Sequence, residues 1–507
     1  MPKHTRFTRI VAAVSSAATA VVCVALSTPA GAQSGSNPPW FPSLMAFEHY
    51  DSGRTKLFER AHFTGSFTHD NTVHVRVSAD DYPTMYNVVY LSGGSLFVFG
   101  GAFGDRGGTG SFVARVDPQT LQTVWFKQLI NTVETDEWNY PGVLSALHDG
   151  FLYLIYGYRL AKLDPKDGKV LGQVTLPTGR AEPRDTSYNG LSGLPDGTLV
   201  AKSVYRERGC EQQGFSAFLC CPLPQLVPNS LVVAIDPRTL EVIDQTMAPE
   251  LIGGRITATE FENHSYVYLT GQKTVFRYIY EDRRLTLDSS WDPGTVVLSD
   301  QTGPSAVAVM NDWIVFTTNG TPAATPLSVV AINQADASRQ FSSQPFAAVG
   351  SPQSWAVSAV SVDPLHNRIF ALDGLAGQIA ALEVRDDGLH TAWTAPQNTA
   401  EFLAVIGPAH RRVVVGTDHA SQLTRPACPV PAGPQDSVVW RNADTGEEIA
   451  RSALLSPVSG GTMVEPGYAG RMYFLAENGK IMELTVEPAS ADETLSEAPA
   501  RDRSLRP

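Results

Sequence analysis

The string Val232-Val-Ala-Ile-Asp-Pro-Arg-Thr-Leu-Glu-Val242 recurs along the chain, and this repetition decides the fold. Close copies occupy residues 113–124 and 160–170, and looser copies occupy 329–334, 379–383 and 438–446. In each copy, alternating apolar residues predict a first strand, and Asp-Pro or its Asn-containing substitute predicts a tight turn. A Val or Ile then begins a second strand, so the repeated unit is a β-hairpin.

Two more predicted strands, joined by a turn rich in Gly, Asp or Asn, precede the hairpins. Such strand pairs occupy residues 143–156, 191–201, 307–316 and 360–372. Four strands per unit, recurring at about 45 residues, are typical of a propeller blade. The hairpin turns fall near residues 117, 164, 236, 281, 334, 385, 443 and 478. We therefore predict an all-β protein with a single β-propeller of eight four-stranded blades, and seven blades as the alternative.

The ring needs a strand from outside the repeat, because the last unit ends before its fourth strand. Residues Thr72–Val77 alternate in the required way and are predicted to complete that unit. Closure removes the exposed edge strand that an open ring would present to other chains. The propeller is thus predicted to span residues 72–487.

The two ends of the chain differ in composition from the repeat. Residues 1–32 combine a basic start, a short apolar run and Ala30-Gly31-Ala32, which predicts a cleaved secretory signal peptide. Residues 33–71 are an N-terminal extension, and residues 488–507 have the composition of a disordered tail. We therefore expect a secreted protein, either extracellular or periplasmic.

Composition excludes several classes of protein. The 507 residues include 38 Lys and Arg against 51 Asp and Glu, a net charge of −13, and 43% are hydrophobic. Such a chain can bury a large core, and its acidic balance argues against nucleic-acid binding. Past the leader no apolar run approaches membrane-spanning length, so we expect no membrane span. We also expect a monomer.

Four cysteines remain after the leader, namely Cys210, Cys220, Cys221 and Cys428. In an oxidising compartment they are predicted to form two disulfides, with three pairings open. Zinc is disfavoured because no histidine lies between Cys210 and Cys221.

Residues that enter the innermost strands are the candidate ligand contacts, since in a propeller these segments converge on one axial mouth. Aromatic and amide side chains recur there, and basic residues follow in the third and fourth blades. The predicted ligand-binding residues are Tyr86, Asn87, Trp138, Asn139, Tyr140, Tyr188, Asn189, Lys202, Arg206, Arg255 and Trp355. This set suits a small polar or aromatic ligand, or a carbohydrate. Packing between blades and hydrogen bonding within turns are the structural alternative for the same residues.

Histidines and basic residues raise two further hypotheses. Four histidines, His49, His62, His69 and His74, precede the first blade and could ligate a metal or act as a base. Their spacing favours a solvent-facing segment, and the metal content stays open. Lys202, Tyr205 and Arg206 could serve a lyase acting on uronates, where a cation neutralises the carboxylate and a Tyr moves the α-proton.

The apolar–Asp-Pro-x-Thr-x-x-Val unit resembles the quinoprotein-like and YVTN-type propeller repeats of exported bacterial proteins, over residues 85–487. For dehydrogenases of that fold the resemblance implies pyrroloquinoline quinone, and the adjacent Cys220 and Cys221 resemble the paired cysteines beside that cofactor. Their Thr-Gly-x-x-x-Trp docking pattern is matched only in part, at 444–446 and 117–125, and no Cys-x-x-Cys-His haem motif occurs.

The sequence thus predicts a secreted propeller that binds a small polar, aromatic or carbohydrate ligand at its axial mouth. A lyase or hydrolase for an extracellular uronate-type substrate and a quinone-dependent oxidoreductase are the alternatives. Whether the protein is an enzyme, and which residues would be catalytic, stay open.

Overall fold

The computed structural model describes residues 39–68, 70–101, 110–221, 227–320, 325–347, 359–421, 423, 428 and 433–489. Of the two compact units of the chain, 1–35 and 36–507, only the second contains described residues. The predicted signal peptide, His69, Trp355 and residues 490–507 of the predicted tail lie outside them.

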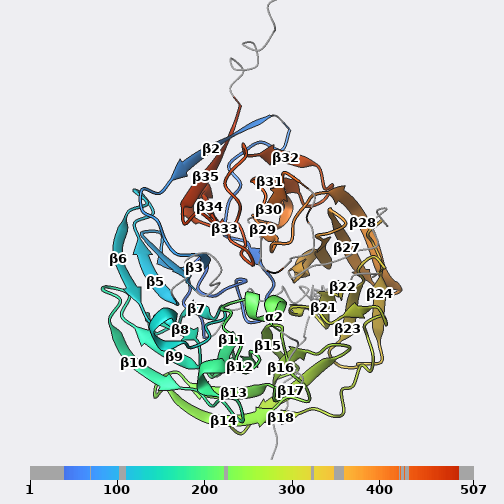
Figure 1. Ribbon diagram of the computed structural model, residues 1–507. Helices are drawn as coiled ribbons and strands as arrows, with labels where there is room; N and C mark the ends of the chain where they lie inside the picture. Colours follow the sequence, from blue (N-terminus) through green and yellow to red (C-terminus); the bar gives the residue numbers. More distant parts are fainter. Residues whose placement is uncertain are drawn as a thin grey trace, which may run out of the picture. The chain divides into compact units, whose positions relative to one another are not determined.

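Eight antiparallel sheets surround a common axis and form the predicted eight-bladed propeller (Figure 1). From the axis outward, blade 1 consists of β3 (Met85–Ser92), β4 (Ser95–Gly100), β5 (Phe112–Val116) and β6 (Thr123–Gln128), and blade 2 of β7 (Val143–Ala146), β8 (Leu152–Tyr156), β9 (Arg159–Leu163) and β10 (Val170–Thr175). In the same order, blade 3 consists of β11 (Thr186–Gly193), β12 (Leu199–Tyr205), β13 (Leu231–Asp236) and β14 (Glu241–Met247), and blade 4 of β15 (Ile256–Phe261), β16 (His264–Thr270), β17 (Val275–Glu281) and β18 (Arg284–Leu287). The inner strands are buried while the outermost ones alternate between exposed and half-buried residues.

Blades 5 to 8 follow the same scheme. Blade 5 consists of β20 (Ala308–Met310), β21 (Trp313–Thr317), β23 (Val329–Asn333) and β24 (Gln340–Ser343), and blade 6 of β25 (Ser361–Asp363), β26 (Arg368–Asp373), β27 (Gln378–Arg385) and β28 (Gly388–Pro396). Blade 7 consists of β29 (Ala404–Ile406), β30 (Val413–His419), β31 (Asp436–Asn442) and β32 (Glu448–Arg451), and blade 8 of β33 (Glu465–Pro466), β34 (Met472–Leu475), β35 (Ile481–Pro488) and β2 (Asn71–Val77). A small extra sheet joins β19 (Gln301–Thr302) to β22 (Asn319–Gly320), and α1 (Thr132–Thr135) lies between blades 1 and 2.

The N-terminal strand closes the ring as predicted. β2 pairs antiparallel with β35, from Asn71 opposite Pro488 to Val77 opposite Met482, and so forms the outermost strand of blade 8. Blade 8 is therefore built from both ends of the described chain, and this pairing closes the ring.

The repeated turn has one geometry at four places. The backbone N–H of the fifth turn residue donates to the carbonyl of the first, at Leu121, Gly168, Leu240 and Gly446. These four residues share a positive φ, between 58° and 75°. The Asp117 carboxylate also accepts the N–H of Gln119 at 2.7 Å. Local bonding by the Asp side chain thus holds the turn, which explains why the motif is visible in the sequence.

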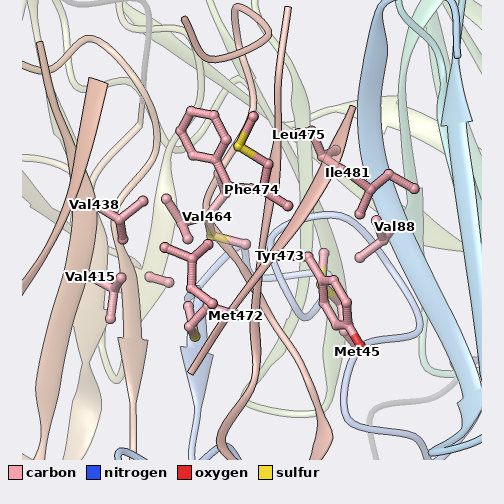
Figure 2. Packing of buried hydrophobic residues seen from close by; sticks show 14 of the residues in the cluster. Met45, Val88, Val415, Val438, Val464, Met472, Tyr473, Phe474, Leu475 and Ile481 are labelled. Carbon is pink, nitrogen blue, oxygen red and sulfur yellow. The ribbon is translucent and has the colours of Figure 1, made fainter. Parts of the chain in front are cut away.

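Apolar side chains fill the spaces between neighbouring blades. Where blades 7, 8 and 1 meet, Val438 of β31, Phe474 of β34 and Val88 of β3 belong to one cluster (Figure 2). Met45, which precedes all the blades, packs into the same cluster. The N-terminal extension therefore contributes to the core.

Residues 39–58, named here the axial strap, bond to the inner part of every blade. Backbone N–H groups of six inner strands donate to strap carbonyls: Tyr90 to Met45, Ala146 to Ala46, Ala258 to Ser52, Val309 to Gly53, Val362 to Thr55 and Val405 to Lys56. In blade 3, the Gly193 carbonyl accepts a hydrogen bond from the Ser52 hydroxyl. In blade 8, the Tyr468 hydroxyl accepts one from the Leu44 N–H. The strap ends in β1 (Leu57–Phe58), which pairs parallel with β29. It thereby occupies the N–H groups that the innermost strands present at the axis.

One disulfide lies within the insertion of blade 3, and a second joins that insertion to the insertion of blade 7. Cys210 bonds Cys221, and Cys220 bonds Cys428, which is one of the pairings that the sequence leaves open. The blade 3 insertion lies between β12 and β13 and contains α2 (Ser216–Cys220), while Cys428 lies between β30 and β31. In a ring of eight, blades 3 and 7 stand opposite each other, so this bond connects opposite sides (Figure 1). Among the described residues, no helix is long and apolar enough to cross a membrane.

Candidate functional site

Charged side chains that the fold removes from solvent gather at the axis. The set, named here the axial cluster, comprises Glu48, His49, Arg54 and Lys56 of the strap with Tyr86, Asn189, Lys202 and Arg255 of the blades. All of them are buried, and the side chains come from β3, β11, β12 and the residue that precedes β15. Buried charges are costly unless paired, so their partners decide what the site can do.

Arg54 is fully buried and has four partners. Its Nη1 donates to Glu48 Oε1 at 2.7 Å and to His49 Nδ1 at 2.9 Å. Its Nε and Nη2 donate to the carbonyls of Ile256 and Leu191. Because His49 accepts from a cation, its ring is held neutral, and burial followed by the charges of Lys56, Arg54 and Arg255 lowers its pKa well below 6.5.

Arg255 joins the strap to blades 1 to 3. Its guanidinium donates to the carbonyls of Pro141 and Asn189 and to the Tyr86 hydroxyl, and it lies 4.9 Å from the centre of the Tyr86 ring. Its Nε lies 3.7 Å from Glu48 Oε1, so Glu48 is shared by Arg54 and Arg255. Burial acts against the charge of Arg255, but Glu48 and Tyr86 outweigh it and raise its pKa.

Lys202 is a fully buried amine without a carboxylate in hydrogen-bond contact among the described residues. Its Nζ donates to Asn189 Oδ1 and, at 2.6 Å, to the carbonyl of Ile252. Burial lowers the pKa of Lys202 well below 10.5, and the charges of Arg255 and Arg54 lower it further. The ammonium form of Lys202 therefore lacks a counter-charge within the described chain.

Lys56 repeats this situation within the strap. Its Nζ donates to the carbonyls of Val360, at 2.6 Å, and of Arg54, and it lies 5.5 Å from the centre of the Phe402 ring. Burial, followed by the charge of Arg54, lowers the pKa of Lys56 to about 7. Two amines thus sit at the axis with neutral hydrogen-bond partners.

A short segment lies between Lys202 and solvent. Ile252 is buried, but the next residue, Gly253, is exposed, and a side chain added there would meet nothing within 4 Å. Asn189 Nδ2 donates to the carbonyl of Gly253 at 2.9 Å. The segment before β15 therefore supplies one partner of Lys202, the Ile252 carbonyl, and holds the other, Asn189, through the Gly253 carbonyl.

Several sequence-predicted residues come together in the axial cluster. Tyr86, Asn189, Lys202 and Arg255 are linked by the hydrogen bonds given above. Tyr140 is half-buried and close enough for its charge state to affect Arg255. These five residues therefore lie near one another at the axis, and their contact with a ligand stays a prediction.

Other predicted residues have structural partners away from the cluster. The Trp138 indole donates to Gly214 O and packs against Phe218 of α2, while Asn139 bonds Ser111 and Gly157. Asn87 donates to Leu144 O, and Tyr188 to Pro177 O at 2.6 Å. Arg206 pairs with Asp185 at 2.7 Å. These residues hold neighbouring blades and the blade 3 insertion together.

The N-terminal histidines do not act as a group. His49 lies buried in the axial cluster, so the expectation of a solvent-facing segment is wrong for it, because the strap runs through the axis. His62 and His74 are exposed, as a solvent-facing segment requires. Among the residues that the structure describes, no group of three or more His, Cys, Asp or Glu side chains is placed to hold a metal.

The sequence reasoning missed Glu48, Arg54 and Lys56. The signal available was that Glu48, Arg54 and Lys56 directly follow an apolar run, residues 40–47, in a segment with no strand pattern. Such a sequence is unusual for a solvated linker, but the blade carbonyls that accept from Arg54 and Lys56 lie more than a hundred residues away.

Comparison with known proteins supports the fold alone. No family model matches the chain, and no curated protein matches its sequence. Among solved structures, the quinohemoprotein alcohol dehydrogenase from Comamonas testosteroni aligns with a TM-score of 0.56 at 11% identity, over 88% of this chain and 80% of that one. The quinohemoprotein alcohol dehydrogenase ADHIIG from Pseudomonas putida HK5 gives 0.54 at 12%, over 92% and 82%. A europium-containing methanol dehydrogenase gives 0.53 at 9%, over 89% and 98%. The chain is thus similar in fold to quinoprotein-type propellers.

Proposed function

We propose that the protein binds a small carboxylate-bearing ligand, of the uronate type, at Lys202 in the axial cluster. The observation that carries the proposal is the buried amine of Lys202, which has two neutral hydrogen-bond partners and two neighbouring arginines. A carboxylate placed against Nζ would supply the missing counter-charge and favour the ammonium form.

The charges around Lys202 favour an anion over a neutral ligand. Arg54 and Arg255 share the single carboxylate of Glu48, so the cluster carries more positive than negative charge when Lys202 is protonated. In a site removed from water this excess acts strongly on an incoming negative charge. The Tyr140 hydroxyl, which is close enough to Arg255 for its charge state to affect that group, supplies a polar contact for the rest of a sugar ring.

The quinone-dependent alternative does not fit these residues. Pyrroloquinoline quinone is a flat, multiply charged ring system that needs free cationic donors and a stacking surface. Here Arg54 and Arg255 donate to protein acceptors, and the Trp138 ring packs against Tyr140 and Phe218. Cys220 and Cys221 bond to Cys428 and Cys210 rather than to each other. We derive no reaction step through a quinone.

The two disulfides support an extracellular or periplasmic location, where such bonds persist. A ligand of that compartment, such as a uronate released from a polysaccharide, matches the chemistry at Lys202.

The test is isothermal titration calorimetry with D-galacturonate and with D-galactose, which share a ring but differ in the carboxylate. We expect heat from galacturonate only, lost in Lys202→Met and retained in Lys166→Met, an exposed lysine in a blade 2 turn. Equal binding of both sugars, or unchanged binding by Lys202→Met, would refute the proposal. Separate incubation with polygalacturonate, followed by the absorbance of unsaturated product, would reveal a lyase.

A further inference from the structure

A second group of buried titratable side chains lies on blade 7, and none of its members belongs to the axial cluster. His419 ends β30 and Asp436 begins β31, and the two are opposite each other in the antiparallel pairing. Glu401 lies in the connection between β28 and β29. All three are buried, with the His419 side chain 6% exposed and that of Asp436 fully buried.

Asp436 holds the imidazole of His419 by one nitrogen. His419 Nδ1 lies 2.5 Å from Asp436 Oδ1 in an ion-pair contact, while Asp436 Oδ2 accepts the N–H of Val458 at 2.6 Å. Asp436 thus lies against His419 through one oxygen, in an ion-pair contact, and is hydrogen-bonded to Val458 through the other. His419 Nε2 is buried and has no hydrogen-bond partner among the residues that the structure describes. A polar atom in that position calls for a partner from outside the described chain.

Glu401 places a second proton carrier beside this pair. Its Oε2 accepts the N–H of Thr462 at 3.0 Å. Burial raises the pKa of Glu401 to about 7, with His419 acting against the shift and Asp436 adding to it. Burial also opposes the charge of His419, but Asp436, Glu401 and Asp418 outweigh it and raise the pKa of His419 above 6.5.

We propose that His419, Asp436 and Glu401 form an acid–base site, in which Nε2 of His419 exchanges a proton with a hydroxyl group of a ligand or with water. The O–H bond of the ligand breaks as the N–H bond at Nε2 forms, and Asp436 stabilises the resulting imidazolium. The reverse transfer, from the N–H at Nε2 to the ligand oxygen, restores neutral His419, and Glu401 acts on this exchange through its charge.

The geometry distinguishes this arrangement from an ordinary structural pair. His366 and Asp363 also make an ion-pair contact, at 2.7 Å, but that ring is more than one-third exposed, so water completes its bonding. In His419 the remaining nitrogen is withdrawn from bulk water and left open. A base oriented by a carboxylate, with a titration near the working pH, is what proton transfer requires.

Acylation by diethyl pyrocarbonate tests whether Nε2 is reachable and basic, because the reagent attacks neutral imidazole nitrogens. The full-length protein is treated across a pH series, and each histidine peptide is quantified by mass spectrometry. We expect His419 to be acylated with a midpoint above pH 6.5, while His49, bonded to Arg54, stays unmodified. His419 that remains unmodified while His62 reacts would overturn the proposal.

Two variants test the roles of the carboxyl groups. Asp436→Asn should lower the His419 midpoint by about one pH unit or more, since the stabilising charge is lost. Glu401→Gln keeps the size of the side chain and an oxygen that can accept the Thr462 N–H, and it should lower the His419 midpoint by a smaller amount. It keeps the test informative if Asp436→Asn fails to fold. A His419 midpoint that is unchanged in Glu401→Gln would contradict the acid–base site. A wild-type His419 midpoint that is not above pH 6.5 would also contradict it. Galacturonate binding at Lys202 is measured separately, so failure of either site leaves the other tested.

Discussion

Replacing Lys56 by Met should change how stability depends on pH. In the folded protein the pKa of this buried amine is lowered from 10.5 to about 7, chiefly by burial. One pKa unit is worth about 1.4 kcal/mol, so the shift corresponds to about 5 kcal/mol between the two states. Between pH 7 and 10.5 the unfolded chain holds a proton on Lys56 that the folded chain has released.

Stability rises with pH wherever the unfolded state binds more protons. The Lys56 amine therefore destabilises the fold most at and below pH 7, and this cost disappears as the pH approaches 10.5. Met removes the titration while keeping an unbranched side chain against Phe402. The bonds to the carbonyls of Val360 and Arg54 are lost at every pH.

The measurement is urea unfolding of wild type and Lys56→Met over the pH range 7 to 10.5, with Lys166→Met as an exposed control. The unfolding free energy of Lys56→Met minus that of the wild type should fall by about 5 kcal/mol across this range. Other groups titrate in both proteins and cancel in the difference. A difference that varies by less than about 1 kcal/mol would show that the strap does not withdraw Lys56 from water, and would refute the reasoning.

Three further predictions concern the buried charges and the disulfides. Arg54→Met leaves Glu48 buried without its closest cation and should cost about 3–5 kcal/mol in urea unfolding, with a smaller cost in the double variant Glu48→Gln/Arg54→Met; equal costs would argue against the pair. Glu401→Gln should gain about 3 kcal/mol relative to the wild type as pH rises from 4.5 to 7, because the folded protein keeps the proton on Glu401 that the unfolded chain releases; a flat difference would contradict the raised pKa. Removing the Cys220–Cys428 disulfide, which spans 208 residues, should cost about 5 kcal/mol, against about 3 kcal/mol for Cys210–Cys221, which spans 11; the reverse order of unfolding midpoints would show that loop closure is not the dominant effect.

The blades could be predicted from sequence because their determinants are local. Asp117 bonds the backbone two residues on, and Leu121 and Leu240 turn the chain with positive φ, so each copy of the motif encodes its own hairpin. The closing strand could be predicted for a related reason. β2 alternates in the same way, and the last unit, which has three strands of its own, lacks the fourth strand that β2 supplies.

The axial cluster could be predicted only in part. Lys202, Asn189 and Arg255 belong to blades, so the repeat itself brings them to the axis. Arg54 belongs to the strap, and its acceptors at Leu191 and Ile256 are distant in sequence and are backbone carbonyls, which leave no trace in side-chain identity. The disulfide pairing was open for a similar reason, since Cys220 and Cys221 are adjacent and either could reach Cys428.

The central claim is that the Lys202 amine receives the carboxylate of a small ligand. A crystal structure of the protein with D-galacturonate tests it most directly. The account predicts a carboxylate oxygen within about 3 Å of Lys202 Nζ, in place of the Asn189 or Ile252 contact. A galacturonate bound elsewhere, with Nζ still bonded to Asn189 Oδ1 and the Ile252 carbonyl, would contradict it.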